Sequence, residues 1–299
     1  MNLLITGAWQ QAAEYMDNLR EHGHNVQFMQ FEKDELPCEP SWVEGIIGNG
    51  IFLSHPIESF THLRYIQLTS AGFDRVPMEY VKSHSITINN ARGVYSIPMA
   101  EYAISGVLAL YKKQRAFFGN QKEHRWEKAR DLQELFGKRV CIFGCGSVGT
   151  ECAKRFEIMG CMVFGIDPIV REHKNFFCIY HTDDAKEVLA KSDIVVITLP
   201  LTEQTRHMFD EKMLAAMRQG TVIVNIARGA LIETDALIRA LGKNIGGAVL
   251  DVFEEEPLSS DSPLWDMPNV IITPHNSFVG SGNNKRMSDV VMSNLKKVQ

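Results

Sequence analysis

The sequence has little of what marks secreted, membrane or metal-binding proteins. Its six cysteines form no Cys-x-x-Cys pair, and no histidine is spaced with them as a zinc ligand would be. Apolar runs are far shorter than the roughly 20 residues that span a bilayer, and the segment from Met1 to Gly7 does not resemble a signal peptide. We therefore expect a cytoplasmic protein with reduced thiols, no metal site and no membrane contact. Cys145 lies in a glycine-rich loop, where its oxidation could hinder ligand binding.

The chain also lacks a strong excess of charge of one sign. Its 299 residues carry a net charge of −5 at neutral pH, so no global field draws the chain to nucleic acid. The local exception is a basic stretch from Lys112 to Arg130, which contains Phe117, Phe118 and Trp126. Such aromatics could stack on bases, but a solvated linker or an arm against a partner subunit is the favoured interpretation. The length favours about two domains.

Apolar runs that alternate with amphipathic stretches predict an α/β fold. In the first part we expect strands at 3–5, 26–28, 45–47, 64–68 and 86–88, and a helix at 12–22. A long apolar helix at 98–113 follows, then a second α/β series over 137–273 and a last helix at 289–295. The predicted fold is two doubly wound parallel-sheet domains, Rossmann-like or flavodoxin-like, with a cleft between them.

A glycine-rich turn in the second series predicts a dinucleotide site. A strand at 139–143 runs into Gly144-Cys145-Gly146-Ser147-Val148-Gly149, a helix follows, and the next strand ends in Asp167. In this strand–turn–helix setting the Gly-x-Gly-x-x-Gly motif is a specific signal. Gly144 permits the tight turn, Gly146 lets the backbone approach a pyrophosphate, and Gly149 lets the helix pack close to the strand.

Polar groups around this turn favour NAD over NADP. Ser147 and Val148 offer backbone N–H groups at the positive end of the helix. Asp167 would accept hydrogen bonds from the adenosine ribose hydroxyls and would repel a 2′-phosphate. Arg171 is long enough to reach the same place and leaves room for NADP.

Three further strands end in residues suited to acid–base chemistry. Arg228 follows the strand 222–226, a run of glutamates that includes Glu256 follows the strand 248–253, and His275 follows the strand 270–273. In a doubly wound sheet such strand ends face the ligand crevice. Arginine binds carboxylates and carbonyls through paired donors. Histidine exchanges protons near neutral pH, and an adjacent carboxylate fixes its ring.

These segments closely resemble the D-isomer-specific 2-hydroxyacid dehydrogenase family. The matching motifs, in the family's order and spacing, are residues 144–149, Leu199-Pro200-Leu201-Thr202, Asn225-Ile226-Ala227-Arg228-Gly229-Ala230-Leu231-Ile232, Leu250-Asp251-Val252-Phe253-Glu254-Glu255-Glu256-Pro257-Leu258 and Thr273-Pro274-His275. Upstream, Thr69-Ser70-Ala71-Gly72-Phe73-Asp74 and Ala100-Glu101-Tyr102 are similar to the family's substrate-loop and domain-joining segments. The first ~60 residues are the least diagnostic part of the chain.

The resemblance implies a role for each residue of the site. Arg228 would orient a 2-keto acid, His275 would act as general acid and base, and Glu256 would keep that histidine protonated. The substrate carboxylate would be held by backbone N–H groups of two short segments, Asn49-Gly50 and Ser70-Ala71-Gly72. The implied cofactor-binding residues are Gly144, Gly146, Ser147, Val148, Gly149, Asp167, Leu199, Pro200, Thr205, Ile226, Ala227, Asp251 (at the nicotinamide carboxamide) and Ser277.

The resemblance also implies the domain layout and the assembly. Residues 1–98 with 276–299 would form the substrate-binding domain, and residues 99–275 the NAD-binding domain. The cleft would close by hinge motion near Pro98 and His275. The segment 99–136 would be a dimerisation arm, so a homodimer is expected.

The substrate is less well specified than the reaction. The loop 48–52 has no lysine or arginine that could hold a phosphate, although Arg75 is a possible exception. This favours a small unphosphorylated acid such as glyoxylate, hydroxypyruvate or pyruvate. One alternative is a phosphoglycerate dehydrogenase, and another, from a different class, is a non-catalytic NADH-sensing protein similar to the corepressors that share this fold. Glu256 argues against a formate dehydrogenase, in which glutamine pairs with the histidine.

Overall fold

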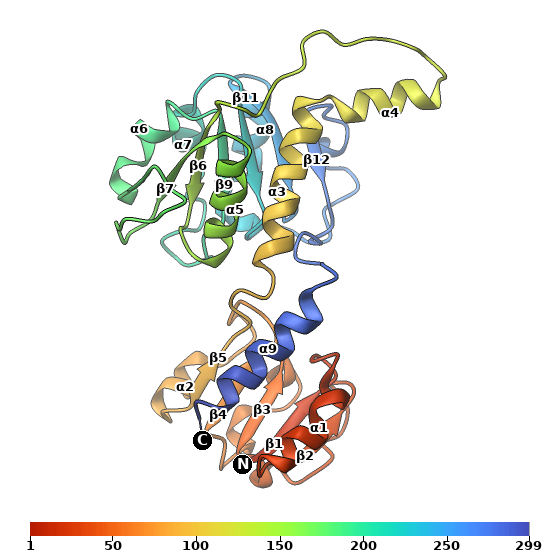
Figure 1. Cartoon of the computed structure of the whole chain (residues 1–299), viewed down its shortest axis with the longest axis vertical. Helices are drawn as coiled ribbons and strands as arrows, with labels where there is room; N and C mark the ends of the chain where they lie inside the picture. The colour runs from red at the N-terminus through yellow and green to blue at the C-terminus, as the bar shows by residue number, and fades with distance from the viewer. Residues whose placement is uncertain (299) are drawn as a thin grey trace. The chain divides into compact units, whose positions relative to one another are not determined.

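The computed structural model describes residues 1–298, which divide into two compact units (Figure 1). Unit 1 comprises residues 1–95 and the segment from 280 onward, and unit 2 comprises residues 96–279. The predicted boundaries, after 98 and 275, are displaced by a few residues. The joining helix begins at Ser96 and belongs to unit 2. At the other boundary, the backbone N–H groups of Asn276 and Ser277 donate to Asp251 of unit 2.

Unit 1 is a five-stranded parallel sheet in the order β2-β1-β3-β4-β5. Its strands are β1 (Asn2–Thr6), β2 (Asn25–Met29), β3 (Gly45–Gly48), β4 (Tyr65–Leu68) and β5 (Thr87–Asn89), and its helices are α1 (Ala12–Glu21), α2 (Met78–Ser83) and α9 (Asn283–Leu295). Side chains of α1 and α9 share one core cluster with β1, and the indole of Trp9 donates to Ser288 Oγ at 3.0 Å. The order is flavodoxin-like, with its switch point between β1 and β3.

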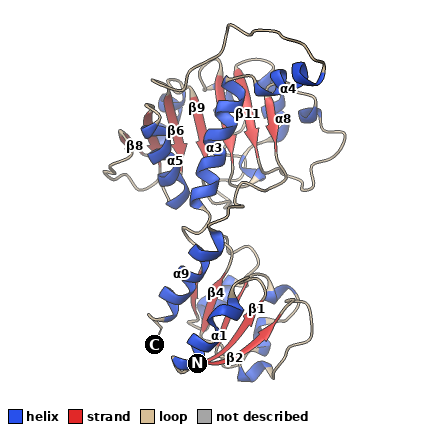
Figure 2. Cartoon of the chain, turned by 45° about the vertical axis from the view of Figure 1, so that its right-hand side comes forward, coloured by secondary structure: helices blue, strands red, loops and turns tan. Residues whose placement is uncertain are grey.

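Unit 2 is a seven-stranded parallel sheet in the order β12-β11-β10-β9-β6-β7-β8 (Figure 2). Its strands are β6 (Arg139–Phe143), β7 (Met162–Ile166), β8 (Cys178–Tyr180), β9 (Ile194–Ile197), β10 (Thr221–Asn225), β11 (Ile245–Leu250) and β12 (Val270–Ile272). Its helices are α3 (Ser96–Tyr111), α4 (Gln114–Lys122), α5 (Ser147–Ile158), α6 (Ala185–Leu189), α7 (Glu211–Ala215) and α8 (Thr234–Leu241).

The central strands of this sheet are buried on both sides, as continuous apolar runs in a parallel sheet require. Helices α3 and α5 share one core cluster, and helices α6, α7 and α8 share the other. The strand order is that of a Rossmann fold, whose switch point lies between β6 and β9. The expected class of two doubly wound parallel sheets is confirmed.

Two local expectations differ from the structure. Part of the basic stretch expected as a linker or an arm forms helix α4, which follows α3 after Lys113 in the left-handed conformation (φ 50°). The guanidinium of Arg115 ties α4 to the segment before β12, donating to the carbonyls of Trp265 and Met267 at 3.1 and 2.8 Å. The last helix begins at Asn283, earlier than expected. Across residues 1–298, no helix has the length and apolarity needed to cross a membrane.

Candidate functional site

The glycine-rich turn has the geometry of a dinucleotide-binding loop. Gly144 adopts φ +90°, a conformation that side chains disfavour. A Cβ on Gly149 would lie 2.0 Å from the carbonyl oxygen of Gly144, so only glycine lets α5 start against the turn. A Cβ on Gly146 would meet nothing within 4 Å, which leaves open space beside the backbone. Ser147 and Val148 begin α5, where unpaired N–H groups attract an anion. These features fit a pyrophosphate.

Asp167 stands at the end of β7 and closes one side of this loop. Its carboxylate accepts hydrogen bonds from the backbone N–H groups of Cys145 and Ile169 at 2.8 and 2.9 Å. Arg171 does reach the same place, because its Nη2 donates to the carbonyl of Cys145 at 2.8 Å. The carboxylate and the guanidinium therefore flank one turn of backbone, and both bear on the choice between NAD and NADP.

The cysteine inside this loop is a packed side chain. Cys145 is buried, and a Cβ on Gly165 of the adjacent strand would lie 2.4 Å from its Sγ. Burial, with Asp167 as a second cause, raises the pKa of the Cys145 thiol to about 12. A thiol with such a pKa is almost wholly protonated at neutral pH and reacts slowly with oxidants.

The candidate catalytic residues follow three neighbouring strands of unit 2. Arg228 comes after β10, Glu256 after β11 and His275 after β12. Asn225 pairs with Leu250, and Leu250 pairs with Ile272, so the three strands end at the same level. The sheet is parallel, and neighbouring strands lie about 4.8 Å apart. Side chains that follow these strands therefore gather at one edge.

His275 and Glu256 form a direct pair at this edge. Nδ1 of His275 lies 2.8 Å from Oε2 of Glu256, and Oε1 of Glu256 accepts a hydrogen bond from the backbone N–H of Phe253 at 3.0 Å. The two side chains are 42% and 37% exposed, so solvent or a ligand can reach them. His275 has φ 51°, an uncommon conformation for a residue with a side chain. The bond at Nδ1 leaves Nε2 as the nitrogen available to a ligand.

Arg228 is held by its own strand end and by a close contact with the glutamate loop. Its Nη1 donates to the carbonyl of Ala227 at 2.8 Å, and Asn225 Nδ2 donates to the carbonyl of Arg228 at 2.9 Å. A Cβ on Gly229 would lie 1.8 Å from the backbone carbon of Phe253. Only glycine lets the loop of the arginine lie against the loop that leads to Glu256.

Asp251 orients the histidine loop. It is fully buried, and its carboxylate accepts three hydrogen bonds, from Thr273 Oγ1 at 2.6 Å and from the backbone N–H groups of Asn276 and Ser277 at 2.8 and 2.9 Å. Its own carbonyl accepts from the N–H of His275 at 2.8 Å. These bonds fix the backbone on both sides of the histidine. A contact with the nicotinamide, which the resemblance implies, stays a prediction.

The other residues expected to bind the cofactor lie near the same strand ends. Leu199 and Pro200 follow β9, and Thr205 donates to the carbonyl of Pro200 at 2.7 Å. Ile226 and Ala227 are buried directly after β10. Within residues 1–298, no group of three or more His, Cys, Asp or Glu side chains could hold a metal ion.

In unit 1 the expected carboxylate-binding amides lie after β3 and β4, and two of them already have a partner. The N–H groups of Asn49 and Gly50 donate to the carboxylate of Glu32 at 2.6 and 2.7 Å. The segment Ser70–Gly72 forms a turn in which Ser70 Oγ donates to the carbonyl of Gly72 at 2.9 Å. Glu32 was not predicted as a site residue, because it lies in a polar loop outside every motif.

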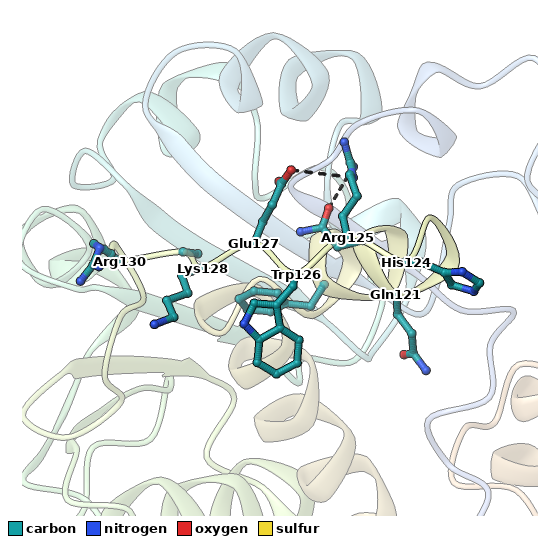
Figure 3. Close-up of a pocket in the computed structure, with 10 residues that line it drawn as sticks. Gln121, His124, Arg125, Trp126, Glu127, Lys128 and Arg130 are labelled. Atoms are coloured by element: carbon teal, nitrogen blue, oxygen red, sulfur yellow. Dashed lines mark hydrogen bonds and ion pairs between the residues drawn. The ribbon is translucent and has the colours of Figure 1, made fainter.

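The segment after α4 carries a separate hollow (Figure 3). Its lining comes from Phe117, Asn120 and Gln121 of α4 and from residues 124–130. Arg125 bonds to Asn120 Oδ1 at 2.9 Å and pairs with Glu123 at 2.9 Å, while Trp126 points the other way and is 94% exposed. An indole this exposed favours a contact with another molecule.

Comparisons with known proteins agree with this geometry. The family model described as "D-isomer specific 2-hydroxyacid dehydrogenase, NAD binding domain" matches residues 104–277. The D-3-phosphoglycerate dehydrogenase of Methanocaldococcus jannaschii is 33% identical over 245 residues, which are 81% of this chain and 47% of that protein. The chain thus spans about half the length of that relative. The D-lactate dehydrogenase of Treponema pallidum is 32% identical over 301 residues, covering 93% of this chain and 90% of that one.

A solved structure supports the same fold. The D-isomer-specific 2-hydroxyacid dehydrogenase of Xanthobacter autotrophicus, in complex with NADPH and MES, is 26% identical with a TM-score of 0.77. The match covers 97% of this chain and 93% of that one.

Proposed function

Because the chain belongs to the D-isomer-specific 2-hydroxyacid dehydrogenase family, we propose that it reversibly reduces a small 2-keto acid to the D-2-hydroxy acid with NADH. The predicted family is confirmed, and so is NAD as the dinucleotide of the matched domain. The observation that carries the proposal is the pair of His275 and Glu256, which lies at the same edge of the sheet as Arg228.

Each of these residues has a task that its contacts support. When bound at the glycine-rich turn, NADH supplies the hydride. Arg228 binds the keto acid through paired N–H donors and stabilises the negative charge that develops on the carbonyl oxygen. His275 gives that oxygen a proton from Nε2, while Nδ1 stays on the carboxylate of Glu256. In the reverse direction the same nitrogen takes the proton from the hydroxyl group.

Two other roles remain alternatives. Phosphoglycerate dehydrogenase is the name of one relative, but no basic side chain occurs in the loop 48–52 and the nearby amides already bind Glu32. These features favour an unphosphorylated acid. An NADH-sensing protein without turnover would bind the cofactor and leave it unoxidised.

The experiment is NADH oxidation, followed at the nicotinamide absorbance, with glyoxylate, pyruvate, hydroxypyruvate and phosphohydroxypyruvate. His275→Ala should lower the rate about 10²–10⁴-fold, since it removes the proton donor. His62→Ala, at an exposed histidine that precedes β4 of unit 1 and contacts the carbonyl of Ser41, serves as the matched control and should leave the rate unchanged. Near-normal turnover by His275→Ala would refute the assignment.

The proposal includes a homodimer formed through the segment 99–136. Four large apolar side chains of this segment are exposed, Phe118 at 60%, Trp126 at 94%, Leu132 at 40% and Phe136 at 76%. A second copy of the chain would bury them and gain about 25 cal/mol for each Å² of apolar surface removed from water. A monomer by light scattering at micromolar concentration would contradict this part of the proposal.

A further inference from the structure

Glu32 occupies an anion position that its own chain builds in unit 1. Oε1 of Glu32 accepts hydrogen bonds from Thr6 Oγ1 at 2.8 Å and from the N–H of Asn49 at 2.6 Å. Oε2 accepts from the N–H of Gly50 at 2.7 Å. Two successive backbone N–H groups that point at one carboxylate are a typical way to bind an anion.

This position is the topological switch point of the sheet. Thr6 ends β1, Asn49 and Gly50 follow β3, and β1 and β3 are neighbours. Ligands of open α/β sheets bind at the carboxyl ends of the strands at this place. A Cβ on Gly48 would lie 2.6 Å from Oε1 of Glu32, so the glycine is needed for the carboxylate to fit. The strand end is therefore shaped around this side chain.

The basic side chain beside this position is exposed to solvent, which screens its charge. The side chain of Arg75 passes nearby, with its Cδ 3.4 Å from the place of a Cβ on Gly50, but the arginine is exposed. The amide oxygen Oδ1 of Asn49 is buried and has no hydrogen-bond partner among residues 1–298. One acceptor beside the carboxylate of Glu32 is thus left without a donor.

We propose that Glu32 is a specificity-determining residue, which keeps the N–H groups of Asn49 and Gly50 from anionic groups and restricts the enzyme to 2-keto acids with a single negative charge. This inference rests on the proposed function. Among the amides of unit 1 that are expected to hold the substrate carboxylate, those of Ser70–Gly72 then remain available. A phosphate or a second carboxylate would meet a like charge and two occupied donors. For partly exposed charges we expect this to lower kcat/KM on the order of 10–100-fold.

The kinetic test compares pyruvate with oxaloacetate and hydroxypyruvate with phosphohydroxypyruvate, in the wild type and in Glu32→Gln. The wild type should prefer the singly charged acid of each pair. Glu32→Gln removes the charge and turns an NH₂ group toward one backbone N–H, which frees that donor. It should raise kcat/KM for oxaloacetate and phosphohydroxypyruvate, which carry a second anionic group, about 10-fold or more. It should leave kcat/KM for pyruvate and hydroxypyruvate within about 3-fold. Glu35→Gln removes the same charge from an exposed position on the same loop and is the matched control.

A different result would show that Glu32 only fills the position until the substrate binds. If the substrate carboxylate displaces Glu32 during binding, Glu32→Gln will lower KM for all acids alike, and the proposal is wrong. Equal kcat/KM of the wild type for the two acids of each pair overturns the proposal without any variant.

A second readout does not depend on turnover. In ¹⁵N-labelled protein, inorganic phosphate should shift the amide signals of Asn49 and Gly50 in Glu32→Ala and leave them in place in the wild type. A matching shift in the wild type would show that Glu32 does not close the position. If none of the acids supports NADH oxidation by the wild type, the proposed function fails. The phosphate titration still decides whether Glu32 closes the two amides.

Discussion

Gly229→Ala is expected to inactivate the protein through backbone geometry, without removing any functional group. The added Cβ would lie 1.8 Å from the carbonyl carbon and 1.9 Å from the carbonyl oxygen of Phe253, and 2.4 Å from the N atom of Glu254. Ordinary contact begins near 3.4 Å, so the two loops must separate by roughly 1.5 Å. Both neighbours are backbone atoms and cannot turn aside as a side chain would.

The separation moves Arg228 away from the loop that carries Glu256. A misplacement of about 1 Å in a catalytic constellation costs about 10²-fold in rate, so we expect kcat/KM to fall at least that much. Overpacking typically costs about 1–3 kcal/mol of unfolding free energy. For a unit of this size, that lowers the melting temperature by roughly 2–12 °C.

The assay is NADH oxidation with the best acid of the panel, together with a melting curve for each variant. Two controls isolate the cause. Gly242→Ala meets nothing closer than 3.7 Å, and it should change neither activity nor stability appreciably. Gly246→Ala would place its Cβ 2.5 Å from the carbonyl of Gly220, at the opposite end of β11, so it should lower stability and spare kcat/KM of the folded protein. Activity of Gly229→Ala within about 3-fold of the wild type would refute the reasoning.

Three further predictions concern other parts of unit 2. Asp167→Ser removes the carboxylate beside the glycine-rich turn and leaves Arg171 in place. The ratio of NADPH affinity to NADH affinity, measured by fluorescence titration, should therefore rise about 10-fold or more. An unchanged ratio would contradict this prediction. Because burial raises the pKa of the Cys145 thiol to about 12, iodoacetamide at pH 8 should label this residue only after denaturation, and mass spectrometry of the native protein checks this. Trp126→Asp should shift the sedimentation equilibrium toward monomer, and an unchanged dimer would exclude this side chain from the interface.

Much of unit 2 could be predicted from the sequence, since local patterns determine it. A strand, a Gly-x-Gly-x-x-Gly turn and a helix are adjacent in the chain, and the structure places Gly144, Gly146 and Gly149 as their spacing predicts. The ends of apolar strands are also visible in sequence, and His275 and Glu256 do lie within hydrogen-bond distance. The family, the doubly wound fold class and NAD follow from these motifs and are confirmed.

Contacts between segments far apart in the chain needed the tertiary structure. No pattern relates Glu32 to the amides of Asn49 and Gly50, because the carboxylate reaches them only after β1, β2 and β3 pair in their order. The need for glycine at 229 likewise depends on a neighbouring loop, whose backbone occupies the space of a Cβ. Residue types and periodicity are local properties, so the kinds of side chain at the strand ends could be predicted from the sequence. Only the tertiary structure showed that the N–H groups of Asn49 and Gly50 are already bonded to Glu32. Such hydrogen bonds depend on where segments that are distant in the chain meet.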